Sequence, residues 1–275
     1  MQNDVMPDGT ASTVSAATPD DKYKIASVQR AMALLGAFLE PPHQFGVSEL
    51  SRMLGQTKNQ TFRLLQTLAD EGAVVIDTET KKYSLGYRML ELGIMAQKGS
   101  PLTIALSPIM DQLALESGET VVLTRMADDM SAICVDKRES SQALQISARI
   151  GSRISLHAGA GSKALLAFSS PEFIERFLAR AQPLRRYLAG TITDPDELRA
   201  ELAHIRERGY SVSDNDLDEG AASVSAPIRN HRGEVVAAIS VASPRTRFTP
   251  DDFARNRQLV LNAAINATNR LQGYR

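Results

Sequence analysis

The stretch that most constrains this chain is Ser51–Leu68, with the sequence SRMLGQTKNQTFRLLQTL. It predicts the end of a short helix, a tight turn at Gly55 and a second helix. Thr57 and Gln60 have the spacing of a capping box at the start of that second helix. Two helices joined in this way form a helix-turn-helix, in which the second helix lies in the major groove of DNA. The stretch therefore predicts a DNA-binding unit.

The second helix has two chemically different faces. Its apolar positions, with Thr61, cluster on one side of a helical wheel and are expected to face a core. Asn and Gln side chains on the other side suit adenine edges, Arg suits guanine, and Lys suits phosphate. An ordinary solvated helix face has the same composition, so the neighbouring elements carry part of the argument. The predicted DNA contacts are Arg30, Thr57, Lys58, Asn59, Gln60, Arg63, Gln66, Lys81 and Lys82.

The flanking sequence completes such a unit. Residues 24–39 predict a helix with two apolar stripes, one of which suits a dimer contact, and Pro41-Pro42 ends it. Two β-prone runs within 72–86 flank a polar tip and predict a hairpin, which makes the unit winged. Residues 87–96 predict a linker helix, and Gly99-Ser-Pro101 marks a boundary.

Length and composition agree with a soluble globular protein of about two domains. The net charge is −1, but residues 22–98 hold ten Lys and Arg against seven Asp and Glu, so the predicted DNA-binding region is the basic one. No apolar run reaches the ~18 residues of a membrane span, and the chain starts without a secretory signal, so we expect a cytoplasmic protein with no membrane contact. The single cysteine, Cys134, excludes an internal disulfide and a multi-cysteine zinc site.

The rest of the chain predicts an α+β fold. β-rich runs at 119–125 and 131–136 form a plausible hairpin around Asp128-Asp129, and further strands are expected at 212, 223–228 and 234–242. Helices are expected at about 160–169, 171–180, 194–208 and 248–271. Residues 1–22 lack large apolar side chains and are predicted to be disordered.

One motif allows several interpretations. A strand over 154–157 followed by Gly159-Ala-Gly161-Ser-Lys-Ala164 matches a dinucleotide-binding fingerprint, which gives the alternative of a nucleotide- or NAD-binding enzyme domain. No second strand ending in a carboxylate follows about 20 residues later, which weakens this alternative. The glycines also suit close strand–helix packing. The free N–H groups of a helix start also attract an anion such as a carboxylate.

Many short sequence motifs of this chain, in order from about Lys24 to Leu271, resemble those of the IclR-type transcriptional regulators (isocitrate lyase regulator family). The resemblance implies a winged helix-turn-helix (23–86), a linker helix (87–99) and a GAF-like mixed α/β effector-binding domain (100–275). It also implies homodimers, often paired into tetramers, on near-palindromic double-stranded DNA. The matching words include QRAMALL at 29–35, ELSRMLG at 49–55, RLLQTL at 63–68, YSLG at 83–86, LHA at 156–158, KALLA at 163–167, TIT at 191–193 and SAP at 225–227.

The resemblance also implies an effector pocket for a small organic acid. Members that bind very small oxo-acids have Asp, Cys and Ser where this chain has Ser213, Ser223 and Ala242, and Gly where Ser162 stands. The less polar set predicts a larger acid, such as an aromatic one. Three arginines are candidate carboxylate partners. The predicted effector residues are Gly159, Ala160, Ser162, Ser213, Ser223, Ser240 and Ala242, with Arg125, Arg138 and Arg149.

Catalysis, metals and cofactors are not expected. The four histidines are scattered without zinc-ligand spacing. His157 and Ser162 lack a third orienting group for nucleophilic chemistry. The acidic run from Asp214 to Glu219 lacks the glycine and terminal glutamate of a calcium loop, so a solvated turn is expected. The sequence therefore predicts a ligand-responsive regulator, a repressor or an activator of a catabolic operon, rather than an enzyme.

Overall fold

The computed structural model describes residues 23–146 and 148–272. The segment predicted to be disordered, 1–22, lies outside these described residues. The chain divides between Ile94 and Met95 into two compact units, and each is described by itself.

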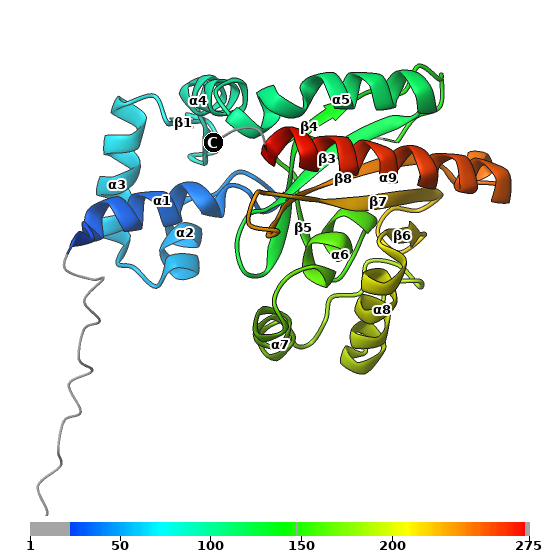
Figure 1. Ribbon diagram of the computed structural model, residues 1–275. Coiled ribbons are helices and arrows are strands. Elements are labelled where there is room, and N and C mark those ends of the chain that lie inside the picture. The colour runs from blue at the N-terminus through cyan, green and yellow to red at the C-terminus, as the bar shows by residue number, and fades with distance from the viewer. Residues whose placement is uncertain (1–22, 147, 273–275) are drawn as a thin grey trace, which may run out of the picture. The chain divides into compact units, whose positions relative to one another are not determined.

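The first unit is built from small helices and a two-stranded hairpin (Figure 1). Side chains from all of these elements except α4 meet in one core around Leu34, Leu50 and Leu65, each of which is fully buried. The elements are α1 (Ala26–Ala37), α2 (Val47–Leu54), α3 (Lys58–Asp70), β1 (Val74–Ile76), β2 (Tyr83–Leu85) and α4 (Tyr87–Lys98), which continues past the division.

The helix-turn-helix forms as predicted, for local reasons. Gly55 ends α2 in the left-handed conformation, with φ of 62°, which glycine adopts without strain. Thr57 then caps α3: its hydroxyl accepts the N–H of Gln60 at 3.2 Å, and the Gln60 side chain accepts the N–H of Thr57 at 3.3 Å. Thr61 is buried, as expected for the core side of the helix, and its hydroxyl donates to the Thr57 carbonyl at 3.1 Å.

The second unit contains a six-stranded sheet in the order β5-β4-β3-β8-β7-β6. Every strand pairing within the described residues is antiparallel. The strands are β3 (Thr120–Met126), β4 (Ser131–Arg138), β5 (Arg153–Ser155), β6 (Ser211–Asp214), β7 (Ala221–Arg229) and β8 (Val235–Pro244).

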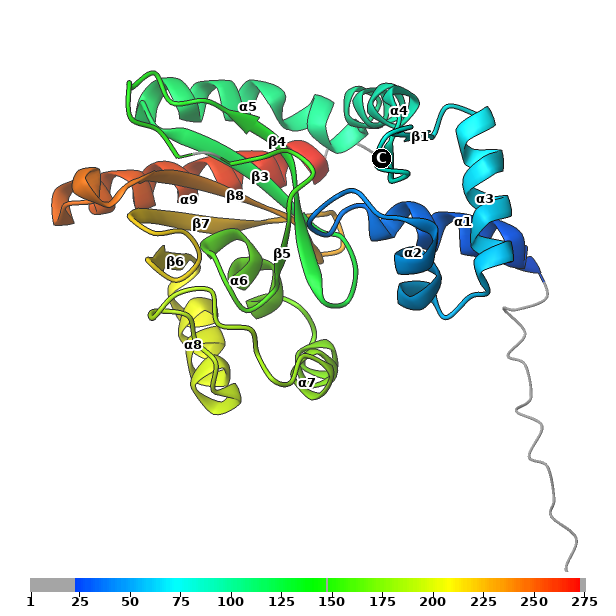
Figure 2. The same cartoon turned by 180° about the vertical axis from the view of Figure 1, so that it is seen from behind.

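Helices cover both faces of this sheet (Figures 1 and 2). One face, with Leu123, Val224 and Val241, packs against α5 (Pro101–Ser117) and α9 (Pro250–Gln272). The other face packs against α6 (Ala160–Ala167), with α7 (Pro171–Arg180) and α8 (Pro195–Arg208) completing a second core. Because strand side chains alternate between faces, small polar residues of β7 and β8 point toward α6.

The predicted α+β architecture is confirmed, including the hairpin β1–β2 and the pair β3–β4. Two details differ. Helix α5 was not predicted, and its interior proline, Pro108, argues against a helix in the sequence. The acidic turn after β6 was predicted to be solvated, but Asp216 is buried within it.

Candidate functional site

The outer face of α3 presents polar side chains to solvent. Lys58, Asn59, Arg63 and Gln66 are all exposed, on the side of the helix away from Thr61 and Leu65. Gln66 also donates to Asp70 at 3.3 Å. The predicted contact residues Thr57 and Gln60 are exposed too, but their side chains hold the capping box. Arg30 is exposed on a different helix, α1.

The wing tip is a compact turn between β1 and β2. Asp77 accepts the N–H groups of Glu79 at 2.8 Å and Thr80 at 3.3 Å, and these bonds lower the pKa of its carboxyl. Lys81 is exposed and adopts a positive φ of 57°, whereas Lys82 is half-buried. The turn therefore holds at least one lysine at the surface.

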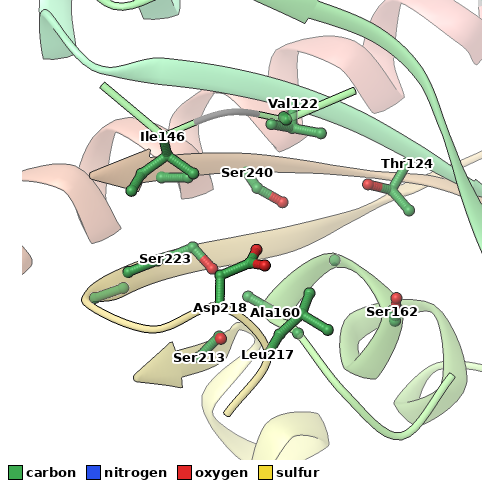
Figure 3. Close-up of a pocket in the computed structure, with 16 residues that line it drawn as sticks. Val122, Thr124, Ile146, Ala160, Ser162, Ser213, Leu217, Asp218, Ser223 and Ser240 are labelled. Atoms are coloured by element: carbon green, nitrogen blue, oxygen red, sulfur yellow. The ribbon is translucent and has the colours of Figure 1, made fainter. Parts of the chain in front are cut away.

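A pocket of about 100 Å³ opens between the sheet and α6 in the second unit (Figure 3). Strands β3, β7 and β8 form one wall, and the start of α6 and the turn after β6 form another. Ile146 and Ala148 contribute from the long loop between β4 and β5. The predicted effector residues that line it are Gly159, Ala160, Ser162, Ser213, Ser223, Ser240 and Ala242.

Two glycines let α6 approach the strands. A Cβ atom on Gly161 would lie 2.8 Å from the Thr124 hydroxyl, closer than van der Waals contact allows. Gly159 has φ of 75° and ψ of 151°, a conformation essentially restricted to glycine. The G-x-G-x-x-A pattern is thus explained by close packing of a helix on an antiparallel sheet.

Polar groups face the cavity, and none of its described lining residues has a cationic side chain. The first intrahelical bond of α6 is donated by Lys163 to Gly159 at 3.1 Å, so the helix itself leaves the N–H groups of its first turn unused. Ser240 donates to Ser225 at 2.9 Å, behind the wall. The site therefore offers hydroxyls and a helix N-terminus, a combination suited to an anion.

A buried ion pair supports the base of the pocket. Lys163 on α6 and Asp216 in the turn after β6 lie 2.6 Å apart, and both side chains are almost fully buried. Asp216 also accepts a bond from the Ser213 hydroxyl, and its carbonyl accepts Thr191 at 2.6 Å. The turn expected to be solvated does expose Asp214, Asp218 and Glu219, but the buried Asp216 anchors it beside the pocket.

The three candidate carboxylate partners lie away from the pocket, which corrects the prediction for each. Arg125 follows Thr124 on β3, so its side chain points to the opposite face of the sheet. Arg138 pairs with Asp111, and with Asp136 at 3.0 Å. Arg149 is exposed in the loop before β5. Residue type alone predicted these arginines, and none of them is among the residues that line the pocket.

The fold does not support the nucleotide-binding alternative. A dinucleotide fingerprint needs a parallel βαβ unit, whereas β5 is a three-residue strand paired antiparallel with β4. His157 is buried with both ring nitrogens engaged, by Ser155 and by the Arg185 carbonyl, each at 2.8 Å. Burial lowers the pKa of His157, so the ring is held neutral in a structural role.

Sequence analysis missed several lining residues. Val122 and Thr124 belong to a β-rich run, and only strand register places Val122 opposite Ser240 and Thr124 opposite Ala238. Leu217 and Asp218 belong to the acidic turn that was assigned to solvent. The one available signal for Val122 and Thr124 was the alternation of side chains along β3: Leu123 faces the core, so its two neighbours point to the other face of the sheet.

Comparison with known proteins decides the family. The model of the bacterial transcriptional regulator IclR C-terminal domain matches residues 96–268, and that of the IclR helix-turn-helix domain matches 27–77. The chain belongs to the IclR family. Among its relatives, the HTH-type transcriptional regulator KipR of Bacillus subtilis is 34% identical over 251 residues, which span 91% of this chain and 98% of KipR. The Escherichia coli transcriptional repressor IclR is 30% identical over 262 residues, 95% of each chain.

Solved structures share the fold of this IclR-family chain. A putative regulator from Silicibacter superposes with a TM-score of 0.78 at 28% identity, covering 90% of this chain and 96% of its own. An IclR homolog from Microbacterium hydrocarbonoxydans, complexed with 4-hydroxybenzoate, has a TM-score of 0.70 at 24% identity, covering 90% and 99%.

The family assignment gives the two units their roles. This chain is a DNA-binding transcriptional regulator with a C-terminal effector-binding domain. KipR and IclR, two of the relatives that it matches, are transcriptional regulators by name. No helix within 23–146 and 148–272 combines the length and apolar character required to span a bilayer.

Proposed function

We propose that this regulator binds a near-palindromic operator as a homodimer and that a small organic acid in the pocket beside α6 changes its affinity for that operator. The observation that carries the proposal is the pocket itself, where seven residues expected from the resemblance surround a helix N-terminus. A ligand there changes DNA affinity only through its different affinities for the DNA-bound and free arrangements.

The polar face of α3 supports the assignment of the DNA contacts. Asn59, Arg63 and Gln66 carry the side chains that recognise base edges, and Lys58 is at the helix entry, where phosphate contacts fit. Lys81 at the wing tip extends the surface to a neighbouring phosphate. Two copies of this unit would occupy half-sites about one helical turn apart.

Exposed apolar side chains support a dimer. Val28 and Met32 on α1 are more than half exposed, and Leu90 and Leu92 on α4 are equally open. A monomer leaves these surfaces in water, whereas pairing with a second copy removes them. The resemblance to IclR-type regulators also implies a homodimer, and it implies that two such dimers often pair into a tetramer.

The composition of the pocket supports a monocarboxylic acid of modest size. Serine and threonine hydroxyls with free helix amides satisfy one carboxylate, and Val122, Ile146 and Leu217 provide an apolar surface for the remainder. A cavity of about 150 Å³ accommodates benzene, so a ring requires some outward movement of Ile146 or Leu217 here. Aromatic acids are the upper size limit of the proposed effectors.

A footprint on the DNA upstream of the gene tests this function with the full chain. We expect two protected half-sites, and a shift in the protein concentration needed for protection when pyruvate, benzoate or 4-hydroxybenzoate is added. Ser240→Leu, which fills the pocket, serves as the matched variant: it should keep the footprint and lose the response. Protection that never responds to any acid, or that responds equally in the variant, would contradict an effector site at this pocket.

A further inference from the structure

The turn between β6 and β7 contributes an acidic group to the pocket that the family resemblance did not indicate. Leu217 and Asp218 both line the cavity, and the Asp218 carboxylate points into it (Figure 3). The turn is fixed by its own bonds: the Asn215 side chain accepts the N–H of Gly220 at 2.7 Å, and the Asp218 carbonyl accepts Ala221 at 3.2 Å. Asp218 is therefore held at the pocket mouth.

The two aspartates of this turn are in opposite situations. Asp216 faces inward, where Lys163 neutralises it and the Ser213 hydroxyl donates to it. The Asp218 carboxylate makes no hydrogen bond or ion pair with any residue in the described part of the chain. Asp218 as a residue is exposed at the pocket mouth, but desolvation by the surrounding atoms and the charge of Asp216 raise the pKa of its carboxyl. Its acceptor oxygens remain available to a ligand.

The charges around the pocket restrict which groups a ligand can carry in addition to its one carboxylate. The amides of α6 satisfy one negative charge, but none of the described lining residues supplies a positive side chain for a second. A second carboxylate near Asp218 would meet a like charge, which is destabilising. A hydroxyl there would instead donate to an ionised acceptor, the stronger class of hydrogen bond.

We propose that Asp218 determines the specificity of this pocket, selecting a monocarboxylic hydroxy acid over the same acid without the hydroxyl and over the corresponding dicarboxylic acid. This inference rests on the proposed function, because it assumes that an acid binds beside α6. Asp218 acts by direct contact with the ligand hydroxyl, and its negative charge excludes the dianion.

Two matched ligand sets test the proposal on the full chain by calorimetry or ligand-observed NMR. One set is 4-hydroxybenzoate, benzoate and terephthalate; the other is 3-hydroxypropanoate, propanoate and malonate. In each set that binds, we expect the hydroxy acid to bind about tenfold more tightly than the parent acid, since a hydrogen bond to a charged group has this magnitude or more. The dicarboxylate should bind more weakly than the parent.

Asp218→Asn should abolish the discrimination against the dicarboxylate and reduce the advantage of the hydroxyl. Glu219→Gln is the matched control, because it removes the same charge from the same turn at an exposed side chain outside the pocket. Ratios between ligands report specificity even if a variant is less stable. Equal affinities within a set, or ratios that Asp218→Asn leaves unchanged, would overturn this inference while acid binding stands. Failure of all six acids to bind the wild-type chain would overturn the proposed function and this inference together.

Discussion

Helices α3 and α6 both begin at a turn next to a surface that we propose binds a partner, DNA for α3 and an acid for α6, but their first turns differ. Thr57 and Gln60 close the start of α3 with reciprocal side-chain bonds. The N-cap of α6 is Gly159, which has no side chain to offer, and its neighbour Gly161 packs against Thr124. The start of α3 is exposed, whereas Ala160 and Ser162 at the start of α6 are buried.

The difference indicates how each helix meets its partner. The capping box satisfies two N–H groups at the start of α3, those of Thr57 and Gln60. We expect DNA recognition by α3 to depend on side chains that project from its outer face. Helix α6 leaves its first amides open inside a pocket, where the proposed acid would accept their hydrogen bonds.

The largest expected effect is on stability, and it comes from breaking the buried ion pair between Lys163 of α6 and Asp216. Lys163→Met leaves the buried carboxylate of Asp216 without its cation, which should cost about 3–5 kcal/mol of stability. We expect a lower denaturation midpoint for the second unit, followed by fluorescence of a label or by hydrogen exchange in its strands.

The exposed pair Arg245–Asp214, at 2.6 Å, is the control for that prediction. Both side chains are well exposed, so Arg245→Met should cost less than about 1 kcal/mol. Equal destabilisation by the two variants would mean that burial does not make the Lys163–Asp216 pair stronger than an exposed one. The buried pair would then not explain how the start of α6 differs from that of α3.

Substitutions on the outer face of α3 should have the next largest effect. Asn59→Ala and Arg63→Ala each remove a proposed base contact, at a cost of about 1–3 kcal/mol in operator affinity and with relaxed preference at one base pair. Fluorescence anisotropy with operator and point-mutated operators measures both quantities. Arg232→Ala removes an equal charge from an exposed turn of the second unit and should leave affinity unchanged. Unaltered binding by both α3 variants would exclude this face from base recognition.

The same contrast explains what the sequence could predict. The capping box, Gly55 and the buried face of Thr61 are determined by residues within one or two turns, so the pattern of 51–68 predicted them directly. The pocket brings together β3, β7, β8 and α6, whose relation depends on register across the sheet, such as Val122 opposite Ser240. Only the family resemblance supplied its residues, and neither approach identified Asp218. The three arginines show the limit of residue type without direction.

Removing the cap of α3 would make its start resemble that of α6. Thr57→Ala deletes the acceptor for the Gln60 N–H, which should cost about 1 kcal/mol of helix stability. Hydrogen exchange of the first amides of α3 should accelerate accordingly. Thr67→Ala on the same helix is the control, because the Thr67 hydroxyl bonds only to the Arg63 carbonyl and caps nothing. If both variants accelerate exchange equally, the box does not distinguish α3 from α6.

The smallest effect is expected at the wing, and it concerns salt dependence more than affinity. Lys81 has a positive φ in a turn that Asp77 holds, and alanine tolerates this conformation no better and no worse than lysine, so Lys81→Ala isolates the loss of charge. Removing one phosphate contact should lower the slope of log affinity against log salt by about one, equally for specific and nonspecific DNA. Lys98→Ala, at the end of α4, should leave the slope unchanged. A loss confined to one DNA sequence would instead assign Lys81 to base recognition, and the wing would then share the role of α3.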